Sequence, residues 1–358
     1  MLSKGFKIVS PKTFEIYYED VELKQGYALV RIDTAAVCKA DLRYFLGKRD
    51  KKVLGLKYPM RLLHEATGTI LKDTTNTLKC GDKVVLVPNI TECSLKDNNE
   101  ICSNNQCMKK CYLRDMKLGE NYCPKAKFVS SNMDGFSCEY IAFPINNLVP
   151  VNRNVSSTKS VFAELTSVGM AAIRKFNEDL NNKVIAIWGD GSLGYIICSI
   201  LKTLTNSRIV VIGRHEEKLC RFPCDKYYFT DSKELFKEKI QLAFECVGSK
   251  GSEGAIDEII DNIVIGGKIM LTGVSESNIA INTRKILEKG IILTGTTRSS
   301  IEDFRKSIDI MENTKYTSYL EELIRDIRNI ENINDYYDVF EEESKSTQLG
   351  KIIMKFHI

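Results

Sequence analysis

The sequence predicts an α/β protein in which a parallel sheet wound with helices lies beside a β-rich lobe. Over residues 155–295, strand-like apolar runs alternate with helical patterns, and such alternation implies a parallel sheet with helices on both faces. Residues 1–150 instead contain short strand-like runs separated by Gly and Pro, which is typical of an irregular β-rich domain. A chain of 358 residues is long enough for both.

The most informative motif is a glycine turn between a strand and a helix. Residues 184–188 are continuously apolar, as in a strand buried on both faces, and residues 193–204 follow the three-four spacing of a helix. Backbone N–H groups at the start of that helix would face a diphosphate, and glycines let it approach closely. The turn predicts dinucleotide binding, with an ordinary strand-to-helix turn as the alternative. Its residues are Gly189, Asp190, Gly191, Ser192, Leu193 and Gly194.

The end of the next strand, residues 208–213, favours NADP(H) over NAD(H). It lies about 20 residues after the last glycine, where NAD-selective folds place an acidic residue. Here the chain has Arg214 and His215, with Lys218 one turn further on. A guanidinium can bind a 2′-phosphate through two parallel hydrogen bonds, so Arg214 is the predicted main contact. The alternative is a solvated basic loop.

The remaining apolar runs complete the predicted organisation. Strands are expected over residues 27–32, 83–88 and 138–143 in the first half, and over 241–247, 268–272 and 291–295 in the second. The strand-like tail, 351–356, is expected to return to the first half. We therefore predict one domain from 1–152 and 297–358 and another from 153–296, with the reactive cleft between them.

Composition excludes several classes of function. The net charge is only +4 and no basic tract indicates a nucleic-acid surface. Residues 1–20 lack the apolar core of a signal peptide, and no apolar run is long enough to cross a bilayer. Twelve cysteines without an export signal indicate a reducing cytosol, where clustered thiols hold metal more often than they form disulfides. We expect a cytoplasmic protein that binds neither nucleic acid nor membrane.

Four residues form a candidate metal site. Cys38 follows an apolar stretch, His64 stands directly before Glu65, and Glu164 precedes the nucleotide-binding half. Thiolate, imidazole and carboxylate together suit Zn²⁺. Because these residues are far apart in the sequence, a buried cysteine and a hydrogen-bonded histidine would explain Cys38 and His64 equally well.

Longer strings resemble a known family over nearly the whole chain. Cys38, His64-Glu65, Asp134-Gly135-Phe136, residues 164–169 and the glycine turn stand in the order of the zinc-dependent medium-chain dehydrogenases. Within that group, the chain is most similar to the ribulose-5-phosphate reductases (ribitol-5-phosphate dehydrogenases) that serve bacterial ribitol-phosphate polymers. The strings that carry this closer resemblance are residues 38–44, 188–191, 243–248, 273–276, 282–284 and 287–290.

The resemblance implies a GroES-like catalytic domain, a Rossmann domain and a set of functional residues. Zinc would be held by Cys38, His64, Glu65 and Glu164, and the nicotinamide would lie against Gly273 and Val274. The implied reaction is NADPH-dependent reduction of ribulose 5-phosphate to ribitol 5-phosphate for teichoic acid or capsule synthesis, zinc polarising the C2 ketone. A homodimer and a functional link to a ribitol-5-phosphate cytidylyltransferase are also implied.

One position departs from the family pattern. These dehydrogenases often have Ser or Thr two residues after the first cysteine ligand, where a proton relay begins, but this chain has Ala40. The proton must then come from a zinc-bound water, from Glu65, or from Tyr44, which matches a substrate-side tyrosine of the polyol dehydrogenases.

A phosphorylated substrate requires cationic side chains in the cleft. Arg43 and Arg298 lie in or next to the family-like strings, and a guanidinium matches two phosphate oxygens. We predict that they bind the substrate phosphate. Lys48, Arg49, Lys51 and Lys52 are interpreted as a solvated loop.

A cysteine-rich insert, about residues 90–125, suggests a second metal. Cys102, Cys107, Cys111 and Cys123 are the preferred ligands of a structural zinc, although their spacing departs from the usual two-residue intervals. Reduced thiols without metal are the alternative.

Two other functions remain open at this point. A dehydrogenase of an unphosphorylated polyol or secondary alcohol would use the same zinc chemistry but would lack a phosphate clamp. A non-catalytic NADPH-binding protein would use the same scaffold, and the intact set of zinc ligands argues against it.

Overall fold

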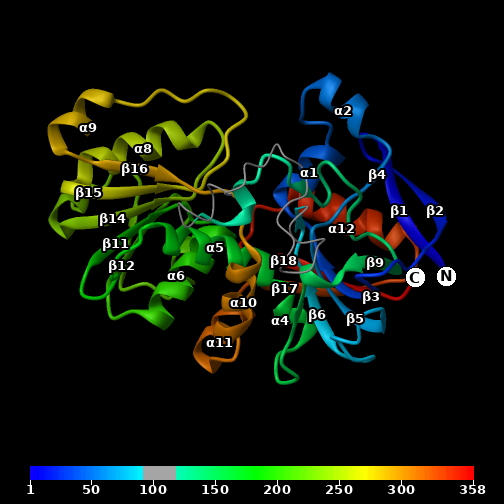
Figure 1. The fold of residues 1–358 in the computed structure, drawn as a ribbon. Helices are drawn as coiled ribbons and strands as arrows, with labels where there is room; N and C mark the ends of the chain where they lie inside the picture. Colours follow the sequence, from blue (N-terminus) through cyan, green and yellow to red (C-terminus); the bar gives the residue numbers. More distant parts are fainter. Residues whose placement is uncertain (92–117) are drawn as a thin grey trace, which may run out of the picture.

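A computed structural model, which describes residues 1–91 and 118–358, has two lobes side by side (Figure 1). One is built on a six-stranded sheet and the other on a seven-stranded sheet, accompanied by sheets of three and two strands. The predicted fold class, a wound parallel sheet next to a β-rich lobe, is confirmed. Among the described residues no helix is both long and apolar enough to cross a membrane.

The first lobe, here the parallel-sheet lobe, contains a fully parallel sheet in the order β13-β12-β11-β14-β15-β16. The strand before the glycine turn, β11, and the next strand along the chain, β12, have the predicted bounds. β15 begins earlier than predicted, at Ile263, and β13 was not predicted. The strands are β11 (Val184–Trp188), β12 (Arg208–Gly213), β13 (Lys226–Phe229), β14 (Ile240–Glu245), β15 (Ile263–Leu271) and β16 (Ile292–Gly295).

Helices cover both faces of this sheet because the central strand is apolar on both sides. Ile185 and Ile187 of β11 join the core formed with α5 and α6, whereas Ala186 and Trp188 pack with α8 on the other face. The helices of this lobe and those packed on it are α5 (Ala163–Lys175), α6 (Ser192–Leu204), α7 (Glu216–Leu219), α8 (Gly251–Asn262), α9 (Thr283–Lys289), α10 (Ile301–Ile310) and α11 (Thr314–Glu321), with the 3₁₀ turn η4 (Leu235–Glu238).

The second lobe, here the β-rich lobe, contains a sheet in the order β10-β6-β5-β3-β18-β17, to which β9 adds by pairing with β3. A second sheet has the order β2-β1-β4, and β7 pairs with β8. Its strands are β1 (Leu2–Ser10), β2 (Thr13–Asp20), β3 (Tyr27–Ala36), β4 (Met60–Arg61), β5 (Glu65–Asp73), β6 (Lys83–Leu86), β7 (Asn89–Ile90), β8 (Lys127–Phe128), β9 (Tyr140–Pro144), β10 (Leu148–Pro150), β17 (Ile324–Ile330) and β18 (Lys351–Phe356).

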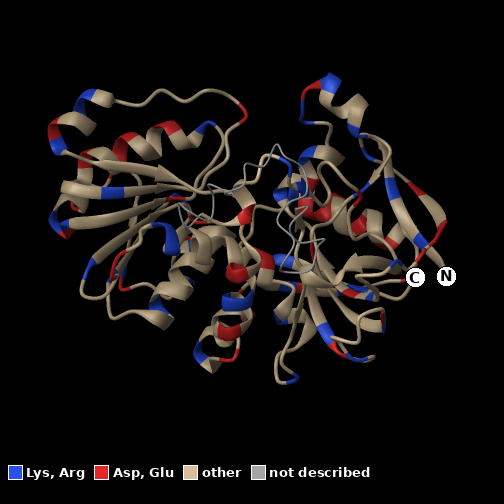
Figure 2. Ribbon diagram, viewed as in Figure 1, with Lys and Arg blue, Asp and Glu red and all other residues tan. Residues whose placement is uncertain are grey.

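Short helices close the β-rich lobe around its sheets. Figure 1 shows α1 and α2 on the side that faces the parallel-sheet lobe, with α12 beneath them. These helices are α1 (Lys39–Phe45), α2 (Lys51–Lys57), α4 (Ser157–Ser160) and α12 (Ile333–Lys345), with the 3₁₀ turns η2 (Glu120–Tyr122) and η3 (Ile145–Asn147). Basic and acidic residues are interspersed over both lobes (Figure 2).

The C-terminal segment is part of the β-rich lobe. β18 pairs antiparallel with β3 and parallel with β17. α12 packs its aromatic side chains on the N-terminal segment. Between centroids, the Phe340 ring lies 5.0 Å from Phe14 of β2, 5.2 Å from Phe45 of α1 and 4.8 Å from Tyr336 of α12 itself. The end of the chain is thus fixed by an aromatic cluster with its beginning.

Replacing Phe340 by Ala should therefore destabilise the protein strongly. Phe340 is fully buried, and loss of a buried phenylalanine side chain costs roughly 3–5 kcal/mol of unfolding free energy. Denaturant unfolding followed by circular dichroism measures this. The control is Phe236→Ala, because Phe236 is 61% exposed and its loss should change little. Equal effects of the two variants would contradict the proposed packing.

Candidate active site

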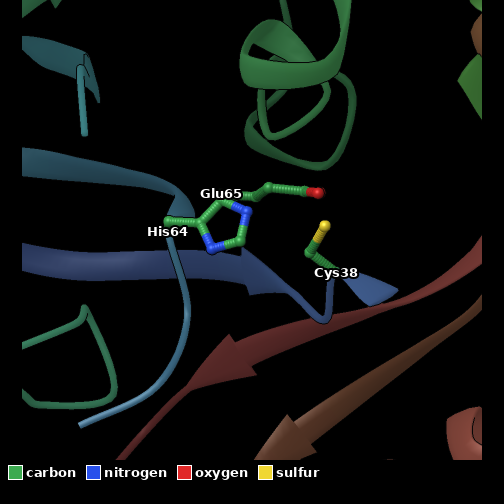
Figure 3. Close-up of side chains that lie close together, drawn as sticks. All are labelled: Cys38, His64 and Glu65. Carbon is green, nitrogen blue, oxygen red and sulfur yellow. The ribbon is translucent and has the colours of Figure 1, made fainter. Parts of the chain in front are cut away.

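Cys38, His64 and Glu65 converge on one buried point, although the sequence separates them. Cys38 lies in the turn between β3 and α1, and Glu65 begins β5. β3 and β5 pair with Ala36 opposite Glu65, which brings the turn beside the two ligands. Their side chains point toward one another (Figure 3), and the candidate ligand atoms all lie within 4.8 Å of each other. Sulfur, nitrogen and oxygen donors at this separation fit Zn²⁺.

Asp41 organises this group from behind. Its buried carboxylate accepts hydrogen bonds from the backbone N–H groups of Cys38 and Leu63, at 3.0 and 3.2 Å, and from the hydroxyl of Ser130. The same carboxylate lies 3.5 Å from Nδ1 of His64. Although burial opposes it, the neighbouring imidazole and these donors hold the pKa of Asp41 below its usual range. Sequence reasoning missed this role. Its only signal was an acid three residues after the residue that caps α1.

Lys351 is the second residue that sequence reasoning missed. Its ammonium contacts both carboxylate oxygens of Glu65, with Oε2 at 2.5 Å, and both side chains are buried. The pairing of β18 with β3 brings it there from 286 residues away. Burial opposes a charged lysine, but the Glu65 carboxylate raises the pKa of Lys351 above its ordinary value. The lysine neutralises a carboxylate that would otherwise be an unpaired buried charge.

Glu164 faces the group without belonging to it. It lies in the first turn of α5, is 8% exposed, and is not among the residues whose ligand atoms lie within 4.8 Å of each other. Burial raises the pKa of Glu164 to about 7, the charge of His64 opposes this, and that of Glu65 adds to it. Its role as a fourth ligand stays a prediction.

The glycine turn has the geometry that a diphosphate needs. Gly189 has a φ of +123°, and a Cβ on Gly194 would lie 2.3 Å from the carbonyl oxygen of Gly189, so neither position accepts a side chain. Gly191, by contrast, caps α6 and has open space where a Cβ would stand. That space lies at the first N–H groups of the helix that begins at Ser192, where an anion is stabilised.

Asp190 and Arg214, both predicted nucleotide-binding residues, differ in what they contact. The Asp190 carboxylate accepts hydrogen bonds from the backbone N–H groups of Arg214 and His215, at 2.8 and 3.0 Å, and lies 2.8 Å from Nδ1 of His215. It therefore fixes the loop that carries Arg214, whose side chain is exposed. Lys218 lies on the same side, 3.4 Å from the His215 ring.

Glu245 holds together the ends of two central strands. One of its carboxylate oxygens accepts from the N–H groups of Val247 and Gly248, at 2.9 and 3.0 Å, and the other from Gly273 at 3.1 Å. A Cβ on Gly273 would lie 2.5 Å from these oxygens, so glycine is required. The next residue, Val274, is 52% exposed and offers an apolar surface.

The predicted phosphate ligands lie on different lobes. Arg43 of α1 pairs with Glu276 of the parallel-sheet lobe, with 3.0 Å between Nη1 and Oε1. Arg298 stacks on Phe128, 4.7 Å from the ring centroid, and Phe128 lies 5.4 Å from the His64 ring. Burial lowers the pKa of Arg298, although the group stays a cation. Arg298 is thus separated from a candidate zinc ligand by a single aromatic ring.

The interpretation of residues 48–52 as a solvated loop is wrong in part. Arg49 is only 20% exposed, and its guanidinium lies 4.3 Å from the ring centroid of Tyr44. Lys51 and Lys52 are exposed but begin α2, where the Asp50 side chain caps the first turn. Tyr44 itself is 2% exposed and packs in the apolar core of the lobe, so its role as a proton donor stays a prediction.

Comparison with known proteins identifies the family. The alcohol dehydrogenase GroES-like domain matches residues 24–153. Ribulose-5-phosphate reductase 2 of Staphylococcus aureus is 34% identical over 363 residues and covers 100% of both chains. The chain belongs to the ribulose-5-phosphate reductase family. The reductase of Streptococcus pneumoniae is 36% identical over 91% of each chain. The crystal structure of S. aureus TarJ in complex with NADPH is 31% identical, with a TM-score of 0.83 over 100% of both chains.

Most of the cysteines predicted to bind a second, structural zinc are not among the described residues. Cys102, Cys107 and Cys111 lie outside the described residues. Cys123 ends the turn η2, whose residues bind the segment that carries Arg298. Asn121 donates to the carbonyl of Thr297 at 2.9 Å, and the Tyr122 hydroxyl lies 2.9 Å from that of Thr296. This part of the insert therefore fixes the segment that carries Arg298.

The pair between Lys351 and Glu65 predicts how zinc and stability are coupled. In Lys351→Met, the metal-free protein should lose roughly 3–5 kcal/mol of unfolding free energy, because Glu65 is left as an uncompensated buried charge. Added Zn²⁺ should restore more stability than in the parent protein, since no lysine competes for the carboxylate. Thermal unfolding with a chelator and with Zn²⁺ measures both effects.

The control for this prediction is Lys355→Met on the same strand. Lys355 belongs to β18 but faces Thr34 in the register and has no contact with Glu65 among those of the described residues. Its substitution should leave the zinc-dependent stabilisation unchanged. A Lys351→Met protein as stable without metal as the parent would refute the role assigned to the pair.

Proposed function

We propose that this protein reduces the ketone of ribulose 5-phosphate with NADPH to give ribitol 5-phosphate. The observation that carries the proposal is the buried Cys38, His64 and Glu65 group in a chain that resembles ribulose-5-phosphate reductases over its full length. Loss of any of these ligands would have favoured a non-catalytic protein. No specific observation favours the alternative function, a dehydrogenase of an unphosphorylated polyol or secondary alcohol.

The protein would provide sulfur, nitrogen and oxygen ligands for the metal at a site largely shielded from water. Cys38, His64 and Glu65 would bind Zn²⁺, with Glu164 as a fourth ligand that faces the group. Zinc bound there would act as a Lewis acid on the substrate ketone oxygen. Asp41 orients the His64 imidazole, as carboxylates next to metal-bound histidines commonly do.

The nucleotide would lie across the ends of the parallel strands. NADPH would supply the hydride to C2 of the substrate. Gly189, Gly191 and Gly194 would leave room for its pyrophosphate, and Arg214 with Lys218 would bind its 2′-phosphate. Glu245 accepts a hydrogen bond from the N–H of Gly273, and the small, apolar surface of Gly273 and Val274 would support the nicotinamide ring.

The substrate phosphate would be bound by guanidinium groups. Arg298 is half-buried beside the metal group and has no ion pair or hydrogen bond among the contacts of the described residues, so an anion could replace its lost hydration. Arg43 approaches from the other lobe. Ala40 cannot relay a proton, and Tyr44 remains a candidate donor from the chain itself, whereas Glu65 is paired with Lys351 as a carboxylate and has no proton to give.

Assembly and context are further parts of the proposal. β16 is the edge strand of its sheet, and the exposed Ile292 and Leu287, 52% and 80% accessible, suit a homodimer formed along that edge. The cysteine-rich composition supports a cytoplasmic location. Ribitol 5-phosphate would pass to a cytidylyltransferase that activates it for teichoic acid or capsular polymer.

A direct assay tests the function. The zinc-replete protein should oxidise NADPH rapidly when ribulose 5-phosphate is present. It should oxidise NADPH far more slowly with xylulose 5-phosphate, ribulose or fructose. Arg298→Ala should raise KM for ribulose 5-phosphate by roughly tenfold or more, the value of one charge-assisted contact, and change that for ribulose little. Absorbance of the reduced nicotinamide measures both. No turnover with any pentulose phosphate would reject the proposal.

Cofactor selectivity gives a separate prediction. Arg214→Ala should weaken NADPH binding by about 1.5–3 kcal/mol, the usual value of a hydrogen bond to a charged group, and leave NADH binding unchanged. Fluorescence titration with each nucleotide measures this. Arg284→Ala is the control, because Arg284 is 88% exposed on α9 and pairs only with Glu288 among the described residues. Equal losses for NADPH and NADH would contradict a 2′-phosphate contact.

A further inference from the structure

Two arginines of the β-rich lobe hold a single glutamate of the parallel-sheet lobe. Nη1 of Arg43 and Nη1 of Arg49 lie 3.0 and 3.6 Å from the same oxygen, Oε1 of Glu276. Glu276 belongs to the loop between β15 and α9, which in Figure 1 extends toward α1 and α2. This cross-lobe cluster, Arg43, Arg49 and Glu276, was not predicted from the sequence.

The cluster has more donors and more positive charge than one carboxylate satisfies. The Arg43 and Arg49 side chains are only 26% and 20% exposed, whereas that of Glu276 is 56% exposed. The Nε atoms of both arginines are buried and have no hydrogen-bond partner among the described residues. Two guanidinium groups offer ten N–H donors and carry two charges against one. A phosphate, with more oxygens and a higher charge than a carboxylate, would satisfy this cluster better.

The cluster is connected along the chain to both sides of the proposed site. Arg43 follows the zinc-ligand candidate Cys38 by five residues, on the helix that Cys38 caps. Glu276 follows Val274, the candidate nicotinamide contact, by two residues. The cluster therefore joins the metal side of the site to the nucleotide side.

Arg49 is built into this position rather than left in solvent. Its guanidinium stacks on the ring of Tyr44, which is 2% exposed, and the backbone carbonyl of Tyr44 accepts a hydrogen bond from the Tyr58 hydroxyl at 2.6 Å. A stacked guanidinium is pre-organised, so it loses little conformational entropy when it binds an anion.

We propose that Arg49 acts with Arg43 in the subsite that also includes Arg298 and binds the substrate phosphate, and that Glu276 is a built-in competing anion. Without substrate the Glu276 carboxylate neutralises Arg43 and Arg49, and the phosphate displaces it when the sugar binds. The exchange frees the loop between β15 and α9 on the nucleotide side. This inference rests on the proposed function, since it requires a phosphorylated substrate.

Inorganic phosphate is the probe that tests the exchange without catalysis. Isothermal titration calorimetry in a phosphate-free buffer should show that Glu276→Gln binds phosphate several-fold more tightly than the parent protein, because the competing charge is removed. Arg49→Ala should bind phosphate at least about tenfold more weakly than the parent protein. The affinity of Arg49→Lys should lie between those of Arg49→Ala and the parent protein, since an ammonium keeps the charge but loses the planar fork. Glu276 is exposed, so its substitution does not threaten folding.

The matched control is Glu288→Gln. Glu288 pairs with Arg284 at 2.9 Å on the exposed side of α9, in the same lobe as Glu276. This variant should bind phosphate as the parent protein does. Unchanged or weaker phosphate binding by Glu276→Gln would overturn the proposal, and Glu276 would then be only a contact between lobes.

Steady-state kinetics separate this inference from the function on which it rests. Glu276→Gln should lower KM for ribulose 5-phosphate, and Arg49→Ala should raise it, with little effect on KM for ribulose or on NADPH binding. Parent protein that reduces ribulose and ribulose 5-phosphate equally well would refute the phosphorylated substrate itself. A strong preference for ribulose 5-phosphate that is unaltered in both variants would refute the subsite alone.

Discussion

The buried pair between Lys351 and Glu65 is the interaction on which the active site depends. It joins the last strand of the chain to the residue that follows His64, and both side chains are buried. A carboxylate without a partner at this depth would cost several kcal/mol. Glu65 therefore has its cationic partner only when β18 is paired with β3, and the metal group depends on the intact β-rich lobe.

Three other carboxylates hold the backbone around the site through hydrogen bonds. Asp41 in α1, Asp190 just after β11 and Glu245 at the end of β14 each accept hydrogen bonds from nearby backbone N–H groups. In doing so they fix the turns that present Cys38, Arg214 and Gly273. A carboxylate accepts several hydrogen bonds at once, whereas a ligand-binding side chain must stay free. The chain thus uses different acids to hold its backbone and to bind metal.

What could be predicted from the sequence was mainly what is local. The strand of residues 184–188 and the helix after it follow from apolar periodicity, and Gly189 and Gly194 from the turn between them. Lys351 and Glu276 could not be predicted, because their roles arise from contacts between segments hundreds of residues apart. Arg49 was misjudged since charge alone suggests solvent, whereas here an aromatic ring buries it. The role of Glu164 as a zinc ligand stays a prediction, because its carboxyl group is near Cys38, His64 and Glu65 but is not among the ligand atoms that lie within 4.8 Å of each other.

One apolar core joins the two lobes, since Val85 and Ile353 of the β-rich lobe belong to the same buried cluster as Ile185 of the parallel-sheet lobe. At the site itself, polar contacts join them. Arg298 belongs to a segment tied to Asn121 and Tyr122, while Arg43 is tied to Glu276. Polar contacts between lobes exchange partners more readily than packed side chains, because each partner can be solvated or replaced by an anion. A substrate phosphate that replaces Glu276, as we propose, would alter the polar contact and leave the apolar core intact, and the alignment of hydride donor and ketone would then depend on the phosphate.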